Sequence, residues 1–367
     1  MKPSRLSVCL ASLAALLALP AAAQDDAAPS DNVVMLPCDG KCPTVTRNVR
    51  SLKGSSPSWP SSMMRGGISE AIVELHYTIG ADGKVGDDVT VLQLVGPPEF
   101  ADAAKRAVRN YVYQPALVDG APVAIAHTLR VIFQYPGIEQ GARSTIVAAY
   151  DKAVSLLKEG KLDEGEAVLN QALQQPHLVF YERGMIANLL AVIALQRKDF
   201  IRARGLTDLA LIFPPDDLPL AVRRSLMRAN IVAALNLGDI AGAGKMIGRL
   251  NRLPSADPAD PLISEFADLR RKIDALDSFS APAAIPAEGE DYQFYLYRRN
   301  FAFTNVKGEL KSVTVSCDQQ ETTSPISLKA EWSVPKSWSD CSLFIRGTAG
   351  TSFNIVQFAA EKPATNP

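Results

Sequence analysis

The spacing of apolar residues changes twice along this chain of 367 residues, which limits it to a protein with several domains. Between residues 71 and 135, segments with apolar side chains at every second position, as in strands, alternate with one segment of helical spacing. Between residues 144 and 277 they follow helical spacing, and from residue 291 aromatic and β-branched residues concentrate. The sequence therefore predicts a multidomain fold: a small α+β domain (59–136), an all-α region (144–277) and a C-terminal all-β domain (291–360).

The α+β domain is predicted in the order strand, strand, helix, strand. The segments that carry these signals are Ala71–Ile79, 89–95, Phe100–Tyr111 and His127–Tyr135. Asp82-Gly83 supplies a hairpin turn between the first two strands.

Several short motifs follow one another in this domain. They are Trp59-Pro60, Ala81-Asp82-Gly83-Lys84-Val85, Phe100-Ala101-Asp102-Ala103-Ala104, Tyr111-Val112-Tyr113-Gln114-Pro115-Ala116 and Gly120-Ala121-Pro122-Val123. In this order and spacing, the stretch from about 58 to 136 resembles the C-terminal domain of the TonB energy transducers. The resemblance implies a non-enzymatic domain that binds outer-membrane receptors by adding an extended receptor peptide to a sheet edge.

The candidate receiving edge is His127 to Tyr135. In strand addition, backbone groups provide affinity, and side chains provide selectivity. The outward-facing set is expected to be Thr128, Arg130, Ile132 and Gln134, because the residues between them share the apolar, inward parity. The alternative is an edge covered by another element, and the sequence leaves open which way the N–H of Arg130 points.

The N-terminus predicts export to the periplasm. Lys2 and Arg5 precede the apolar run Leu6–Leu19, and Ala21-Ala22-Ala23 has the form that signal peptidase cleaves, which gives a signal peptide over residues 1–23. The run is shorter than the roughly 20 residues that span a bilayer, so no stable membrane span is expected after cleavage. The alternative is an uncleaved anchor in the inner membrane, with the chain acting as a TonB-type energy transducer.

Residues 24–58 are predicted as a flexible lead-in with a small Cys loop. After cleavage the remaining cysteines are Cys38, Cys42, Cys317 and Cys341, an even number in an exported chain. Local pairing, Cys38 with Cys42 and Cys317 with Cys341, is the simplest of three connectivities. Half of a zinc site at Cys38 and Cys42 is the alternative, but no second ligand pair completes it.

The helical region shows internal similarity. Units begin near Gly160, Lys198 and Gly238, each with a small residue five positions later, at Gly165, Ala203 and Ala243. This resembles tetratricopeptide repeats, although the spacings of 38 and 40 exceed the usual period of about 34. A concave peptide-binding face and a plain spacer are both open interpretations.

Residues 278–290 contain two prolines, Pro282 and Pro286, without an apolar period and are predicted as a linker. Beyond them, five segments are predicted as strands of a sandwich or open barrel: 292–297, 313–317, 326–332, 342–345 and 353–358. Trp332 and Trp338 are expected in its core rather than as a carbohydrate platform.

Composition and motifs favour a protein without catalytic activity. The charges, 38 Lys+Arg against 39 Asp+Glu, provide no basic stripe for nucleic acid, and three His and five Cys leave little for a metal site. No nucleophile elbow, phosphate loop or zinc motif occurs, so no catalytic, cofactor or metal residues are predicted. His76 and His127 are expected on strand faces opposite the core.

The leading hypothesis is a periplasmic protein–protein interaction module that works with TonB-dependent outer-membrane receptors. The alternatives are the anchored transducer and a repeat scaffold for envelope assembly.

Overall fold

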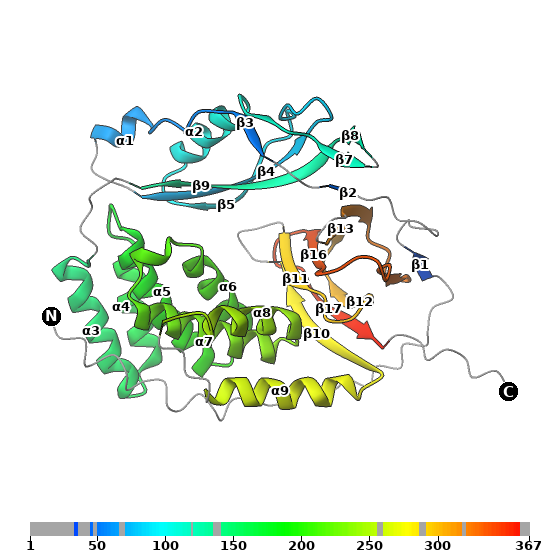
Figure 1. The fold of residues 1–367 in the computed structure, drawn as a ribbon. Coiled ribbons are helices and arrows are strands. Elements are labelled where there is room, and N and C mark those ends of the chain that lie inside the picture. Colours follow the sequence, from blue (N-terminus) through cyan, green and yellow to red (C-terminus); the bar gives the residue numbers. More distant parts are fainter. Residues whose placement is uncertain are drawn as a thin grey trace. The chain divides into compact units, whose positions relative to one another are not determined.

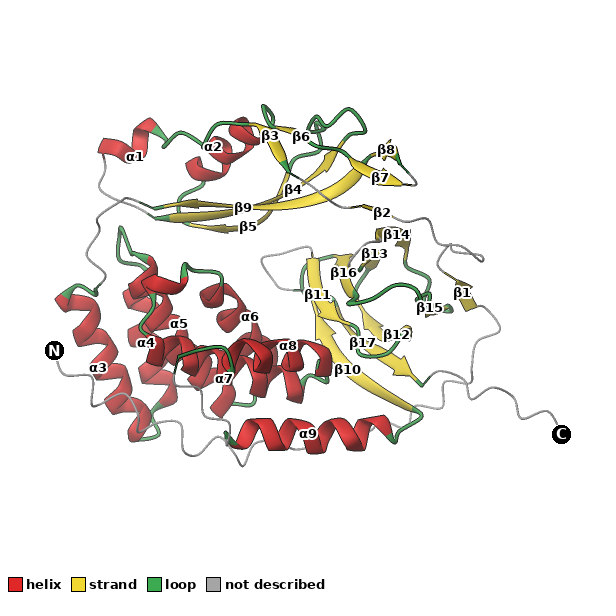
Figure 2. Ribbon diagram, in the orientation of Figure 1, coloured by secondary structure: helices red, strands yellow, loops and turns green. Residues whose placement is uncertain are grey.

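The computed structural model describes residues 33–35, 45–46, 50–65, 70–118, 120–134, 141–254, 260–285, 291–317 and 321–359 (Figures 1 and 2). These residues form two compact units, which divide within a single helix. The first unit comprises the described residues of 41–186, and the second comprises residues 33–35 with the described residues from 187 onward. The predicted signal peptide, Cys38 and Cys42 lie outside the described residues.

The first unit contains the predicted α+β domain. Its three-stranded antiparallel sheet has the order β5-β4-β9, with β4 (Ala71–Ile79) between β5 (Thr90–Val95) and β9 (Ile125–Phe133). Helix α2 (Glu99–Val108) adds Phe100, Ala104 and Val108 to the core. The predicted order of strand, strand, helix, strand is therefore confirmed.

Shorter elements complete this domain, and the sequence did not predict most of them. They are α1 (Ser61–Arg65), a sheet of β2 (Val45–Thr46), β7 (Ala116–Val118) and β8 (Ala121–Val123), and a pair of β3 (Ser51–Lys53) with β6 (Val112–Tyr113). The segment expected to be a flexible lead-in thus supplies β2 and β3, and also β1 (Val33–Met35) of the second unit.

Gly83 shows why the turn after β4 needs a glycine. Its φ is +78°, and a Cβ there would lie 2.1 Å from the carbonyl oxygen of Tyr113. The Tyr113 N–H donates to the Gly83 carbonyl at 2.8 Å, which holds β6 against this turn. Two of the motifs read from the sequence therefore meet in space.

The helical region confirms the internal similarity at its turns. Its helices are α3 (Ser144–Lys158), α4 (Leu162–Leu173), α5 (Phe180–Gln196), α6 (Phe200–Leu211), α7 (Leu220–Asn236), α8 (Ile240–Leu250) and α9 (Pro261–Asp274). Gly160, Lys198 and Gly238 join α3 to α4, α5 to α6 and α7 to α8, each with a positive φ between 60° and 75°. In each turn the next N–H bonds a carbonyl five residues back, as in a Schellman cap. The described residues include no helix with both the length and the apolar character needed to cross a membrane.

A polar network in which Arg204 and Asp239 are largely buried and Asp208 is half exposed joins α6, α7 and α8. Arg204 contacts the carboxylates of Asp208 at 2.8 Å and Asp239 at 3.1 Å, and Asp208 accepts from Asn230 at 2.7 Å. Asp239 also caps α8 by accepting from the N–H of Gly242. Because buried charges are costly without partners, this pairing ties the register of three helices together.

The C-terminal β region consists of two sheets. One has the order β1-β15-β12-β17-β10 and the other β11-β16-β13-β14. The strands are β10 (Ser278–Ala284), β11 (Asp291–Tyr295), β12 (Asn300–Lys307), β13 (Leu310–Ser316), β14 (Glu321–Pro325), β15 (Glu331–Ser333), β16 (Ser342–Gly347) and β17 (Ser352–Phe358). Tyr292 of one sheet contacts Phe353 of the other, and Trp332 and Trp338 are buried as expected.

Two expectations for this part of the chain are wrong. Residues 278–284, expected in a linker, form β10, whose Phe279, Ala281 and Ala283 are buried. Phe279 belongs to the same buried cluster as residues of α7, α8 and α9, so apolar burial outweighs the turn-forming tendency of Pro282. The predicted strand 326–332 is also misplaced, because a turn separates β14 from β15.

Removal of the Cys317–Cys341 disulfide should destabilise the β region selectively. The bridge joins the end of β13 to the start of β16 across a separation of 24 residues. Loops of this size predict roughly 3 kcal/mol of stabilisation in the chain-entropy model. In the double variant Cys317→Ser, Cys341→Ser, hydrogen exchange should quicken in β13 and β16 and stay unchanged in β4. Equal loss of protection in β4 would contradict the prediction.

Candidate functional site

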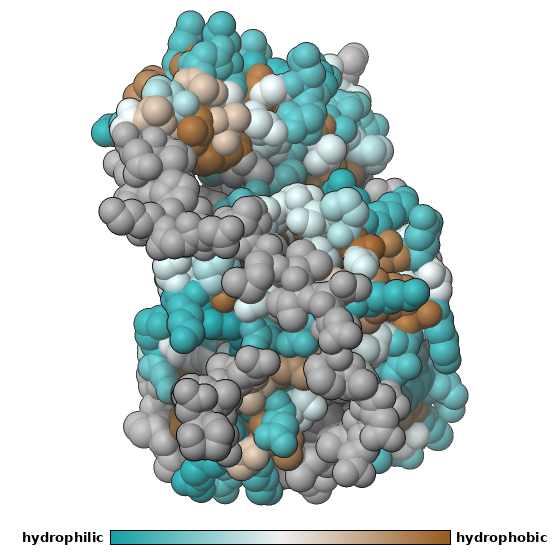
Figure 3. Space-filling view, turned by 90° about the vertical axis from the view of Figure 1, so that its right-hand side faces the viewer, coloured by the Kyte–Doolittle hydropathy of each residue, from teal (hydrophilic) through white to brown (hydrophobic). Residues whose placement is uncertain are grey.

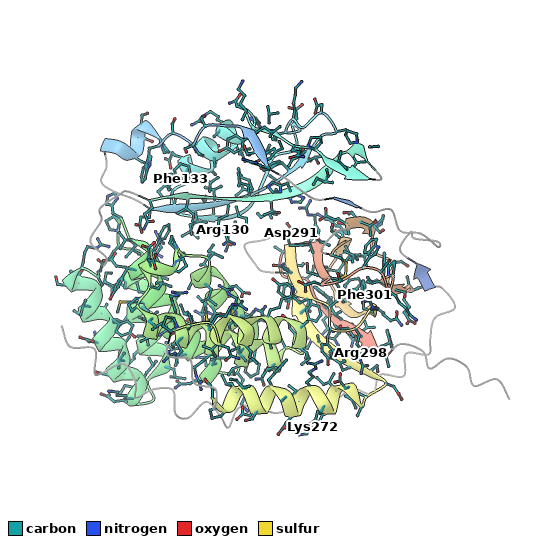
Figure 4. The ribbon with its side chains drawn as sticks, in the orientation of Figure 1. Arg130, Phe133, Lys272, Asp291, Arg298 and Phe301 are labelled. Carbon is teal, nitrogen blue, oxygen red and sulfur yellow. A yellow bond between two sulfur atoms is a disulfide. The ribbon has the colours of Figure 1, made fainter. Side chains whose placement is uncertain are left out.

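The candidate site residues lie on β9, at one edge of the β5-β4-β9 sheet. Thr128, Arg130, Ile132 and Gln134 are exposed, while Val131 and Phe133 between them are buried. Figure 4 shows Phe133 and Arg130 on opposite sides of the strand. The predicted alternation is therefore present, and Tyr135, the end of the predicted strand, lies outside the described residues.

The backbone of β4 shows which groups of β9 face outward. The Thr78 N–H donates to Asp88 at 3.3 Å, and the Thr78 carbonyl accepts from the Gly86 N–H at 2.8 Å. Asp88 and Gly86 belong to the segment that leads into β5, so the N–H and carbonyl groups of Thr78 point to the β5 side of β4. The N–H and carbonyl groups of successive residues point to opposite sides of an antiparallel strand, so those of Val73 and Leu75 point toward β9.

The register transfers this alternation to β9. Val73 is opposite Val131 and Leu75 is opposite Leu129, within an unbroken ladder from Ala71↔Phe133 to Ile79↔Ile125. Val131 and Leu129 therefore bond β4, and the N–H and carbonyl groups of Thr128, Arg130 and Ile132 point away from the sheet. In the described part of the chain, β9 pairs with β4 alone. These groups form the free edge of β9, defined here as the outward backbone of residues 128, 130 and 132.

Side chains on the outer face of β9 contact β4 in cross-strand pairs. The Arg130 guanidinium lies 3.3 Å from the Glu74 carboxylate, and the His76 Nδ1 lies 3.3 Å from the Thr128 hydroxyl. Ile132 lies opposite the buried, apolar Ile72 and is itself 44% exposed. Exposed ion pairs stabilise little, so these contacts set side-chain direction more than they stabilise the fold.

Glu70 links the end of this strand to the helical region within the first unit. It is buried, and its carboxylate accepts from the Gln134 side chain at 3.4 Å and from the Phe180 N–H at 2.5 Å. Phe180 begins α5, where backbone N–H groups lack intrahelical partners and favour a negative charge. The α+β domain and the start of α5 are thus joined by a specific polar contact, which the sequence did not predict.

The inner face of β9 is held by aromatic residues. Trp59 makes edge-to-face contacts with Phe100 at 5.2 Å and Phe133 at 6.1 Å, measured between ring centroids. The hydroxyls of Tyr77 and Tyr113 share a buried hydrogen bond of 2.5 Å. These contacts fix β9 from one face and leave its edge exposed.

His127 does not lie where the sequence interpretation placed it. It packs against the rings of Tyr77 and Tyr113, with both centroid distances at 5.5 Å, so the expectation of a face opposite the core is wrong. The alternation that turns Leu129 and Val131 inward turns His127 inward as well. Burial, with a smaller contribution from the charge of His76, lowers the pKa of His127 below its ordinary value.

Other surfaces offer weaker candidates. Large apolar side chains that are exposed among the described residues are scattered: Leu52, Ile132, Ile201, Leu220, Leu276 and Leu328. Hydrophilic residues make up most of the described surface that is visible in Figure 3. Scattered apolar residues need no functional explanation. The described residues also contain no group of three or more His, Cys, Asp or Glu placed to hold a metal ion.

Comparison with known proteins assigns a class to this domain. Residues 55–135 match the family model described as Gram-negative bacterial TonB protein C-terminal. Residues 55–135 are thus similar to the C-terminal domain of TonB proteins, and the match covers less than half of the chain.

Two solved structures show weaker likenesses. The solution NMR structure of the Pseudomonas aeruginosa TonB CTD is 26% identical over 26% of this chain and 93% of that chain, with a TM-score of 0.23. A variant of 2-hydroxyethylphosphonate dioxygenase is 14% identical over 88% of this chain and 72% of that chain, with a TM-score of 0.15. A search of curated proteins found no match.

Acidification should destabilise the α+β domain through His127. Its pKa lies below the unfolded value of about 6.5, so the unfolded chain takes up the proton first as pH falls. The stabilising contribution is therefore complete above that value and is lost at lower pH. Thermal unfolding at pH 7.5 and pH 5 should show a smaller pH dependence in His127→Gln than in the parent.

The control for this measurement is His76→Gln, which removes the exposed neighbour of His127. It should retain most of the parent's pH dependence. Equal pH profiles for the parent and His127→Gln would refute the assignment.

Proposed function

We propose that this protein is a periplasmic interaction module that binds an extended peptide of a TonB-dependent outer-membrane receptor by strand addition at the free edge of β9. The module takes part in transmembrane transport as a protein–protein contact, without enzymatic activity or a cofactor. Export by the signal peptide over residues 1–23 places it in the periplasm. Sequencing the N-terminus of the mature protein tests that location, and an intact leader would favour an inner-membrane transducer.

The observation that carries this proposal is the coincidence of two features. The family match covers β9, and β9, like β5 on the opposite side of the sheet, is an edge strand that leaves a row of backbone groups unused by the described part of the sheet. A peptide aligned with it can pair with Thr128, Arg130 and Ile132 through main-chain hydrogen bonds. Arg130 and Ile132 lie beside that path and contribute one charged and one apolar contact.

A second candidate function is a repeat scaffold for envelope assembly. It is favoured by the repeated Schellman turns at Gly160, Lys198 and Gly238. The small residues five positions later, Gly165, Ala203 and Ala243, are all buried, as close helix pairing in tetratricopeptide-like units requires. In this reading the helices bind the partner, and the β9 edge is not used.

Proline substitution on the edge distinguishes the two functions. Arg130→Pro removes an N–H that faces the free edge, so it should weaken receptor-peptide binding by about tenfold or more while the domain stays folded. Arg130→Ala should have a much smaller effect, because the backbone makes the contact. The measurement is titration of the full chain with an extended receptor peptide, since Glu70 contacts Phe180 beyond the domain.

The matched controls are two further proline variants. Thr128→Pro faces the same edge and should weaken binding in the same way. Leu129→Pro removes an N–H that bonds β4 and should unfold the domain in circular dichroism. If Arg130→Pro and Thr128→Pro fold and bind as the parent does, or if the parent binds no receptor peptide, the scaffold function leads instead.

A further inference from the structure

A polar pocket lies in the second unit, where the last turn of α9 meets the β region. It has a volume of about 410 Å³ and is lined by Arg270, Asp274, Tyr297, Arg298, Arg299, Asn300 and Ala359. Figure 4 shows Arg298 beside this end of α9. The volume is within the range of small-molecule sites, and the lining contains three guanidinium groups and one carboxylate.

Backbone carbonyls hold two of these guanidinium groups in position. Arg298 donates to the carbonyls of Asp277 at 3.0 Å and of Ile273 and Leu276 at 2.7 Å each. Arg299 donates to the carbonyls of Pro335 at 2.6 Å and Trp338 at 2.8 Å. An Arg side chain has five N–H donors, so each group keeps donors for a ligand.

The loop that carries these arginines is held in place by the buried side chain of Gln357. Gln357, which is fully buried, accepts from the backbone N–H groups of both Tyr297 and Arg298 at 2.9 Å. The Arg298 guanidinium also stacks over the Phe279 ring, 5.2 Å from its centroid. Preorganised groups bind ligands with less loss of conformational entropy.

The charges of the pocket are not balanced within it. Arg298 and Arg299 have no carboxylate within 4 Å in the described part of the chain. Arg270 donates to the Tyr297 hydroxyl at 3.1 Å, and that hydroxyl donates to Asp274 at 2.5 Å, so the single carboxylate is already engaged. Three arginines and one aspartate give the lining a net charge of +2. The carbonyls at the end of α9, which would repel an anion, are covered by Arg298.

We propose that this pocket binds an oxyanion, a carboxylate or phosphate group, between Arg270, Arg298 and Arg299. Planar guanidinium groups with spare N–H donors match the two oxygens of such a group. The oxygen of the Asn300 side chain accepts from Ser333 at 2.8 Å, and within the described residues its amide N–H groups remain as further donors. The site is independent of the strand-adding edge, because it belongs to the other compact unit.

Isothermal titration calorimetry on the full chain tests the site with two probes at an ionic strength of about 0.15 M, where the Debye length is about 8 Å. One probe is an N-acetylated, C-amidated tetraglutamate peptide, and the other is inorganic phosphate. At least one probe is expected to bind saturably with a Kd below about 10 mM. The probe that binds more tightly identifies whether the oxyanion is a carboxylate or a phosphate. Arg270→Gln and Arg299→Gln should each weaken that probe's affinity by about tenfold.

Arg271→Gln is the matched control for charge. Arg271 follows Arg270 on α9, is also exposed, and pairs with Asp268 rather than lining the pocket. The affinity of the Arg271→Gln variant for the probe should stay within about twofold of the parent's, because distant exposed charges are screened. The proposal is overturned if neither probe binds, or if Arg271→Gln weakens binding as much as Arg270→Gln does. Arg270→Gln keeps the test valid if Arg299→Gln unfolds, since the Arg270 side chain is exposed and its hydrogen bond is to the side chain of Tyr297 rather than to the backbone.

Discussion

The position of β4 in the middle of its sheet is the constraint on which the candidate site depends. In a middle strand, the backbone N–H and carbonyl groups of successive residues point alternately to the two neighbouring strands. Because those of Thr78 point toward β5, those of Val73 and Leu75 point toward β9. The backbone N–H and carbonyl groups of Thr128, Arg130 and Ile132 must then point away from β4. Side-chain parity and backbone direction coincide on these residues, because both repeat every two positions. The exposed side chains and the free hydrogen-bonding groups of β9 therefore belong to the same residues.

Rigid support distinguishes this edge from a flexible one. The aromatic contacts of Trp59 with Phe100 and Phe133 hold one face of β9, and Glu70 holds its end to the first residue of α5. A peptide that adds to β9 meets a strand that is already ordered, so less conformational entropy is lost on binding. The same Glu70 contact means that a load applied along β9 reaches the helical region through a hydrogen bond to a helix terminus.

Local periodicity predicted the elements with long, regular patterns. The alternation in Ala71–Ile79 and the helical spacing from Phe100 gave the order of the α+β domain, and the turns at Gly160, Lys198 and Gly238 marked the helix pairs. Strands of two or three residues, such as β2 and β3, have too few positions to show a period. The sequence did not reveal β10 because Pro282 and the nearby Pro286 are typical of a linker, although alternate residues of β10 are buried and Phe279 packs in a core formed with distant helices. The direction of the Arg130 N–H and the Glu70 contact depend on long-range pairing, which no local pattern encodes.

The charges beside the free edge also decide which partners can pair with it. An exposed edge invites pairing with a second copy of the same strand, and proteins limit this with charged side chains. Arg130 lies at the centre of the edge, between Thr128 and Ile132. A symmetric antiparallel pair centred there would place two Arg130 side chains directly opposite each other on one face. Like charges in that arrangement are destabilising, whereas a different peptide with a neutral or acidic residue at that position avoids the repulsion. The pairing of Arg130 with Glu74 reduces this effect without removing it, because the guanidinium remains exposed. The edge thus discriminates against its own copy while its backbone stays available to an extended peptide of another sequence.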